Sequence, residues 1–141
     1  MALTLHNEYS LNESFFMPKI LVVDDDIHAT TLFRTILTAK GFETFIVNDS
    51  AVAVQTANST KPDLIILDLM MPEPNGFEVC KMLRADPKYS RTPIVIFTAM
   101  GDSESKTLAL EAGADEFLTK PFRVEDLMEK LQTLINKAKK R

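Results

Sequence analysis

Short apolar runs that do not alternate with polar residues restrict most strongly how this chain can fold. Four runs of leucine, isoleucine, valine and phenylalanine occupy residues 20–23, 45–47, 64–67 and 94–97, and a fifth candidate strand covers residues 116–119. Strands have this pattern when both of their faces are covered, as happens in a parallel sheet. The runs therefore predict a sheet that is buried between two layers.

Stretches with helical periodicity lie between and after these runs. The expected helices are residues 27–40 stopped by Gly41, a helix capped by Ser50 and running through residue 57, a helix marked by Phe77, Cys80 and Leu83, residues 103–112 stopped by Gly113, and a last helix from Val124. The last helix is the clearest, because one apolar stripe runs along it. The stripe consists of Val124, Leu127, Met128, Leu131, Leu134 and Ile135.

Strand and helix thus alternate five times, which predicts an α/β fold with a doubly wound parallel sheet. Right-handed crossovers leave few arrangements. For 141 residues we expect the flavodoxin-like (βα)5 fold with strand order 2-1-3-4-5. Residues 18–138 would form this domain, with an N-terminal extension at 1–17 and a basic C-terminal tail at 139–141.

The composition argues against a secreted, membrane-spanning or nucleic-acid-binding protein. The formal net charge is −4, whereas nucleic-acid binding usually needs a basic patch. No apolar stretch approaches the ~20 residues of a membrane helix, and residues 1–16 lack the Lys or Arg of a signal peptide. The single cysteine, Cys80, cannot form an internal disulfide. We therefore expect a cytoplasmic protein that contacts neither membrane nor nucleic acid.

Acidic side chains follow two of the expected strands. Asp24, Asp25 and Asp26 follow the first strand, and Asp68 follows the third. These strands are neighbours at the switch point of the predicted sheet, where ligands of such folds bind. Clustered carboxylates raise one another's pKa, and a cation such as Mg²⁺, which prefers oxygen ligands, relieves the conflict. Asp24 to Asp26 could instead only cap the next helix, but Asp68 argues against that interpretation.

A hydroxyl and an ammonium group are expected on the same rim of the sheet. Thr98 ends the fourth strand, and Lys120 follows the fifth. Beside a metal-bound carboxylate, these groups form a phosphoryl-binding constellation. Asp68 can then act as a nucleophile and form an aspartyl phosphate. Lys120 could instead be a solvated surface lysine, although Pro121 directly after it favours a fixed turn.

Four motifs in this order resemble the response-regulator receiver family of two-component signalling, and in particular its chemotaxis-regulator-like members. The motifs are ILVVDDD at residues 20–26, LDLMMP at 67–72 with Gly76, FTA at 97–99 and TKPF at 119–122. The spacing of the acceptor aspartate, the threonine and the lysine also agrees with the family. The resemblance covers about residues 18–138.

The resemblance implies that Asp68 is the phosphoryl acceptor. It implies that Asp25, Asp68 and the backbone carbonyl of Met70 ligate Mg²⁺, while Asp24 acts mainly through water. The phosphoryl donor would be a histidine kinase or a histidine phosphotransfer protein. The chain would then be a signalling switch and not an enzyme.

The resemblance also implies how particular residues respond when the domain is phosphorylated. Lys120 would pair with one phosphoryl oxygen, and Thr98 would donate its hydroxyl to another. Phe117 stands where the family often has tyrosine, so it would change rotamer without a hydroxyl to bond a partner. The Lys120–Pro121 peptide is expected to be cis. The output would be a downstream protein target or a self-dimer, through the fourth helix, fifth strand and fifth helix.

Two methionines occupy positions that, in the family, flank the route of the water that hydrolyses the aspartyl phosphate. They are Met70, two residues beyond the acceptor, and Met100, two residues beyond the threonine. Neither can orient a water, and both are bulky. We therefore expect slow autodephosphorylation.

Other functions compete with this interpretation. A flavodoxin-like cofactor protein would want a hydroxyl- and glycine-rich phosphate loop where this chain has three aspartates. A phosphatase with an aspartyl-phosphate intermediate would usually place an acid at the position of Met70. A receiver fragment of a longer multidomain regulator and a non-phosphorylated interaction module are further alternatives, and the intact Asp, Thr and Lys set argues against the second.

Some chemically capable residues have simpler explanations. Helical spacing places Phe77 and Cys80 in the core. His28 lies near the acidic residues and could carry out phosphotransfer, but a solvated helix face is its expected place.

Overall fold

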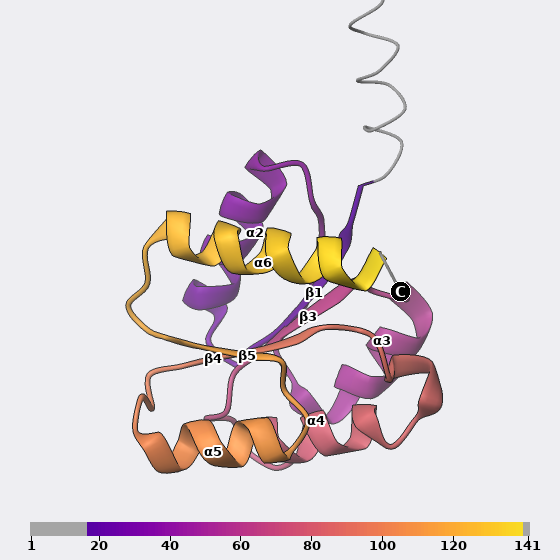
Figure 1. Ribbon diagram of the computed structural model, residues 1–141, viewed down its shortest axis with the longest axis vertical. Coiled ribbons are helices and arrows are strands. Elements are labelled where there is room, and N and C mark those ends of the chain that lie inside the picture. Colours follow the sequence, from indigo (N-terminus) through magenta and orange to yellow (C-terminus); the bar gives the residue numbers. More distant parts are fainter. Residues whose placement is uncertain (1–16, 140–141) are drawn as a thin grey trace, which may run out of the picture.

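The computed structural model describes residues 17–139, which form two layers of helices around a central sheet (Figure 1). The sheet is parallel, and its strands lie in the order β2-β1-β3-β4-β5. The strands are β1 (Lys19–Val23), β2 (Glu43–Val47), β3 (Leu64–Leu67), β4 (Ile94–Thr98) and β5 (Glu116–Thr119). This arrangement confirms the predicted flavodoxin-like order.

The helices cover both faces of the sheet, as Figure 1 shows. They are α2 (Ile27–Ala39), α3 (Ala53–Thr60), α4 (Gly76–Arg84), α5 (Ser103–Glu111) and α6 (Val124–Lys139), with short 3₁₀ turns η1 (Ser50–Val52) and η2 (Pro87–Tyr89). Helices α2 and α6 pack on one face, and α3, α4 and α5 pack on the other. Each layer completes a separate apolar core.

Strand β1 shows why the apolar runs do not alternate. Its Leu21 and Val23 join the core under α3, α4 and α5, whereas Ile20 and Val22 join the core under α2 and α6. Successive side chains of a strand point to opposite faces. Because both faces are covered, every position from residue 20 to residue 23 is buried and apolar.

Polar residues define where the helices begin. Asp26 accepts hydrogen bonds from the backbone N–H groups of His28 and Ala29 and thereby caps α2. Asn75 caps α4 in a reciprocal arrangement with Glu78. At the other end of α2, the chain turns at Gly41, whose φ of 91° is unfavourable for residues with a side chain.

The prediction that Ser50 caps a helix is wrong. Asp49 provides the cap, because its carboxylate accepts from the backbone N–H of Ala51 at 3.0 Å. Ser50 begins the turn η1, and α3 follows only from Ala53. The Ser50 hydroxyl is buried and donates to the backbone carbonyl of Pro72 at 3.1 Å. The Ser50 hydroxyl therefore binds the loop between β3 and α4 and does not cap a helix.

The apolar stripe of α6 is confirmed, and α2 buries a narrower stripe. Leu127, Leu131 and Ile135 of α6 are fully buried. On α2, Leu32 is half exposed, and the buried positions are Thr30, Phe33 and Leu37. The polar Thr30 thus belongs to the inner face of α2, where it has hydrogen-bonding partners.

Residues 1–16 of the predicted extension (residues 1–17) and residues 140–141 of the predicted tail (residues 139–141) lie outside the described part of the chain. Within residues 17–139, no helix has both the length and the apolar character that crossing a bilayer needs. The Lys120–Pro121 peptide is cis, as expected, and so is Glu73–Pro74.

Candidate functional site

Three carboxylates meet at the carboxyl ends of β1 and β3. One carboxylate oxygen from each of Asp24, Asp25 and Asp68 lies within 4.8 Å of the other two. The register of the sheet explains this proximity, because Val23 is paired with Leu67 and the next residue of each strand leaves the same rim. The backbone N–H of Asp68 donates to the carbonyl of Val23 at 3.0 Å and continues the pairing.

The carboxylates differ in their exposure to solvent. Asp24 and Asp68 are buried, whereas Asp25 is exposed. Burial raises the pKa of Asp24 to about 6, and the charge of Asp68 adds to this effect. The backbone N–H of Asp26, which donates to Asp24 Oδ1 at 3.0 Å, lowers the pKa in part, as does Lys120. The negative charge of Asp24 is therefore unfavourable in the folded site, because the carboxylate is buried and lies beside Asp68.

Lys120 extends into this acidic cluster and is not a solvated surface lysine. Its Nζ lies 3.1 Å from Asp24 Oδ2 and 3.5 Å from Asp68 Oδ2. Burial by itself lowers the pKa of Lys120, but hydrogen bonds and charge from the two aspartates outweigh burial and raise it. The lysine therefore stays protonated and offers a fixed positive charge beside Asp68.

Thr98 and two methionines complete the rim. Thr98 is fully buried at the end of β4, and its backbone carbonyl accepts from the Lys120 N–H at 2.9 Å. The Met100 N–H donates to Thr98 Oγ1, and the Met70 N–H donates to Asp68 Oδ1, both at 3.3 Å. Met70 is 57% exposed and Met100 is 39% exposed. The backbone of each methionine thus borders the site, while its side chain is accessible to solvent.

The donor set fits a hard divalent cation. Its charged groups are three carboxylates with oxygen donors only, and two of these carboxylates are buried. Within the described residues, the cluster contains no thiolate or imidazole, which softer metals would prefer. Oxygen ligands with few protein contacts suit Mg²⁺.

The other residues singled out from the sequence lie away from this chemistry. Cys80 is buried, its thiol contacts the carbonyl of Ala112 at 3.4 Å, and burial raises its pKa to about 11. Phe77 and Phe117 are partly buried against the core under α3, α4 and α5. His28 is exposed on α2. Cys80 is therefore a core residue, as expected, whereas Phe77 is only partly buried and packs against that core. His28 occupies a solvated face.

Sequence reasoning missed two residues that touch the acidic loop. The side-chain amide of Asn48 donates to the backbone carbonyl of Asp24 at 2.9 Å and to Thr30 Oγ1 at 3.0 Å. A signal was available for Thr30, which lies three residues before Phe33 on the apolar side of α2. No pattern in the sequence marked Asn48.

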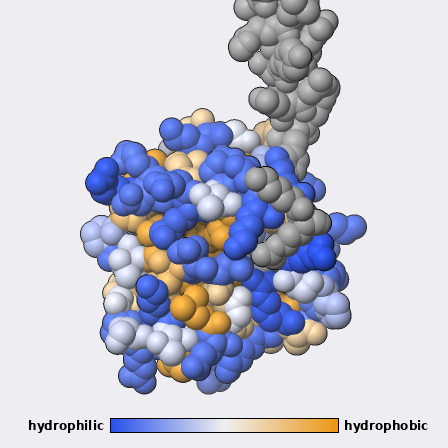
Figure 2. Space-filling view, viewed as in Figure 1, coloured by the Kyte–Doolittle hydropathy of each residue, from blue (hydrophilic) through white to orange (hydrophobic). Residues whose placement is uncertain are grey.

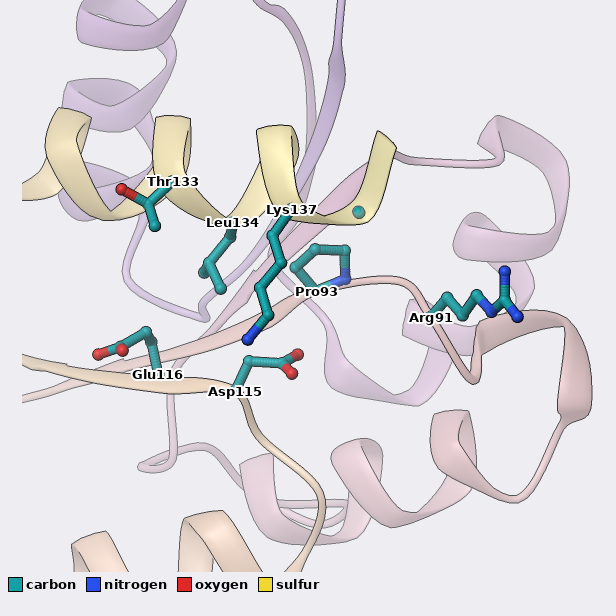
Figure 3. A pocket seen from close by; sticks show the side chains of 8 residues that line it. Arg91, Pro93, Asp115, Glu116, Thr133, Leu134 and Lys137 are labelled. Carbon is teal, nitrogen blue, oxygen red and sulfur yellow. The ribbon is translucent and has the colours of Figure 1, made fainter. Parts of the chain in front are cut away.

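A second concavity lies at the opposite end of the sheet and is separate from this site. Figure 3 shows Thr133, Leu134 and Lys137 of α6 above Asp115 and Glu116 at the start of β5. The cavity has a volume of about 160 Å³. The acidic cluster lies at the carboxyl ends of the strands, whereas this cavity lies at the amino end of β5, so it takes no part in the chemistry of the cluster.

Residues 20–132 match the family model of the response regulator receiver domain. The chain belongs to this family and is a receiver domain of a two-component response regulator. Among its relatives, the DNA-binding response regulator MtrA of Mycobacterium tuberculosis is 39% identical over 119 residues, which are 84% of this chain and 51% of that protein. The phosphate regulon regulator PhoB of Rhizobium meliloti is 37% identical over 123 residues, 87% of this chain and 54% of that protein. The chain thus spans about half the length of these relatives.

Solved structures confirm the fold. The chemotaxis protein CheY4 of Vibrio cholerae has a TM-score of 0.80 and 34% identity, over 84% of this chain and 99% of that one. A response regulator from Chloroflexus aurantiacus has a TM-score of 0.82 and 30% identity, over 86% of this chain and 99% of that one. Both likenesses extend over almost the full length of the known structure.

Proposed function

We propose that this receiver domain is a switch that takes a phosphoryl group onto Asp68 from a phosphohistidine of a sensor kinase or phosphotransfer protein. The observation that carries the proposal is the contact of one ammonium group, Lys120 Nζ, with both buried carboxylates of the rim. A carboxylate beside a fixed cation can attack phosphorus, because the cation offsets the charge of the incoming group.

Each residue of the site has a distinct task in this transfer. An Asp68 oxygen forms the new P–O bond while the P–N bond to the donor histidine breaks, and the imidazole leaves as the neutral base once it has taken up a proton. Lys120 pairs with one phosphoryl oxygen, and Thr98 donates its hydroxyl to another. Mg²⁺ would be held by Asp25, Asp68 and the Met70 carbonyl, with Asp24 acting through water, and it would neutralise charge on the transferred group.

An apolar hollow next to the site supports a protein as the donor. Its volume is about 280 Å³, and Lys120 lines it together with Phe33, Phe97 and Phe122. Leu32 of α2 also lines the hollow and is half exposed, and Ile27 at the start of α2 is 65% exposed. Apolar side chains at the mouth of a charged site suit an apolar protein surface better than a small, highly charged phosphate donor.

We further propose that the phosphorylated state is recognised through α5, β5 and α6, by a target protein or by a second copy of the domain. Thr98 and Phe117 would link the phosphoryl group to this surface, because they lie on the adjacent strands β4 and β5. A protein target fits the formal charge of −4 better than direct nucleic-acid contact does.

Intact-protein mass spectrometry tests the proposal. With Mg²⁺ and acetyl phosphate, the parent protein should gain one phosphoryl group, and Asp68→Asn should not. Asp26→Asn is a matched control, since asparagine also caps a helix well and Asp26 lies outside the carboxylate cluster. Mg²⁺-dependent labelling of Asp68→Asn at the parental level would contradict the assignment.

A further inference from the structure

The turn that follows β2 contacts both loops that carry the acidic cluster, although none of its residues belongs to the cluster. One loop, between β1 and α2, contains Asp24 and Asp25. The other, between β3 and α4, contains Asp68 and Met70. Asn48 and Ser50 of the turn each reach one of these loops.

Asn48 holds the first loop through both hydrogens of its side-chain amide. One is donated to the backbone carbonyl of Asp24 at 2.9 Å and the other to Thr30 Oγ1 at 3.0 Å. The orientation of the amide is chemically determined, because a backbone carbonyl can only accept. Thr30 in turn donates to the carbonyl of Ile27 at 3.1 Å. The loop is therefore held at the end of β1 and in the first turn of α2.

Ser50 holds the second loop. Its buried hydroxyl donates to the carbonyl of Pro72 at 3.1 Å. Pro72 lies four residues after Asp68 and two after Met70, in a stretch that belongs to neither β3 nor α4. Within the described residues, this hydrogen bond joins the β3–α4 loop to the turn after β2.

We propose that Asn48 and Ser50 are positioning residues, which set the distance between the two halves of the metal site before the cation binds. This inference rests on the proposed function, in which Asp24 and Asp25 act from one loop and Asp68 and Met70 from the other. Mg²⁺ demands near-ideal octahedral geometry, so its affinity depends on how well the two loops are held in register. Residues that orient metal ligands without touching the metal are known to control affinity in this way.

The test compares Mg²⁺ affinity in Asn48→Ala, Ser50→Ala and the double variant, by NMR titration of the Asp25 and Met70 amide signals. Loss of a supporting contact around a metal typically weakens affinity on the order of tenfold or more. Each single variant should therefore raise the Mg²⁺ dissociation constant several-fold, and the double variant should raise it further. Asp49→Ala is the matched control, because Asp49 caps the same turn through the Ala51 N–H.

A second measurement separates positioning from a structural role. In acetyl phosphate labelling, the two variants should regain the parental rate at saturating Mg²⁺, because only the affinity for the cation has changed. Unchanged dissociation constants together with lowered melting temperatures in EDTA would overturn the inference, and so would an equal loss of affinity in Asp49→Ala. If the parent protein itself did not bind Mg²⁺, the proposed function would fail, and that result is distinguishable from the first two.

Discussion

Among single residues, Asp24 has a carboxylate whose negative charge is unfavourable in the folded receiver domain. Its side chain is buried at the end of β1, next to Asp68, and the only cation that contacts it in the described residues is Lys120. Burial is the largest cause of its raised pKa, and the charge of Asp68 adds to it. A group that holds its proton more tightly in the folded state makes the stability of the domain depend on pH.

The sign of this dependence follows from the direction of the shift. The pKa of Asp24 rises from 3.8 to about 6 on folding, so its contribution to stability is complete below pH 3.8 and is lost as the pH rises through 6. In metal-free buffer, Asp24→Asn should therefore be more stable than the parent at pH 7.5, by on the order of 3 kcal/mol. The gain should shrink towards zero at pH 4. Urea denaturation at both pH values measures it, and the same gain at each pH would contradict the assignment.

We expect Met70 and Met100 to lengthen the lifetime of the proposed phosphorylated state. Their backbone N–H groups contact Asp68 and Thr98, and their side chains are exposed to solvent. Neither thioether can orient an attacking water as an amide or carboxylate could. The double variant Met70→Asn with Met100→Glu should accelerate loss of the phosphoryl group about tenfold, which requires only about 1.4 kcal/mol off the barrier. Equal half-lives of the phosphorylated parent and double variant would show that the methionines do not protect the acyl phosphate.

At the scale of secondary-structure elements, the start of α4 packs directly against the backbone of Asp68. A Cβ atom added at Gly76 would lie 2.2 Å from the carbonyl oxygen of Asp68 and 2.6 Å from Leu69 Cα. Backbone atoms cannot rotate away as a side chain can. Helix α4 can therefore approach β3 only because its first residue lacks a side chain.

Gly76→Ala should accordingly push α4 away from Asp68. We expect a loss of about 1–3 kcal/mol in the free energy of unfolding, the range typical of overpacking. We also expect slower phosphorylation, because the Asp68 backbone shifts. Gly101→Ala is the matched control, since its Cβ would meet only the side chain of Thr119, whose methyl group would lie 2.9 Å away. Chemical denaturation of both variants gives the comparison. Equal losses of stability would show that contact with the Asp68 backbone is not what requires glycine.

For the molecule as a whole, the site and the proposed output surface are adjacent but distinct. The site lies at the carboxyl ends of the strands, whereas the output surface runs along α5, β5 and α6 at one edge of the sheet. Figure 2 shows apolar residues between α5 and α6 on a largely hydrophilic face. Phe117 and Leu118 of β5 and Leu134 of α6 are partly buried hydrophobic residues of this region.

Phosphorylation should therefore change this edge more than the far edge of the sheet. Beryllofluoride bound to Asp68 with Mg²⁺ should shift the amide NMR signals of Phe117, α5 and α6, because an equilibrium between two arrangements is biased by the new charge. Signals of α3 beyond the immediate pocket should stay constant and serve as the internal control. Shifts confined to the rim itself would mean that site and surface are uncoupled in this protein.

Much of this arrangement followed from local patterns in the chain. Apolar runs without alternation, such as residues 20–23 and 64–67, required a sheet covered on both faces, and the crossover rule then limited the strand order. Once the order was known, Asp24 and Asp68 had to share a rim, because neighbouring parallel strands end on the same side. The fold and the acidic cluster could therefore be predicted from residue types and positions alone.

The contacts between loops depended on the tertiary structure. The contact of Lys120 with Asp24 and Asp68 joins residues 96 and 52 positions apart, and the choice of partner depends on distances that no local pattern encodes. Serine is a residue type that often caps helices, but the Ser50 hydroxyl donates to the carbonyl of Pro72, which folding brings within reach. Asp49 supplies the cap instead. Hydrogen bonds between segments depend on how the apolar runs pack together. Residue types and spacing therefore predicted where the chemistry lies, and only the packed structure decided which groups hold it in place.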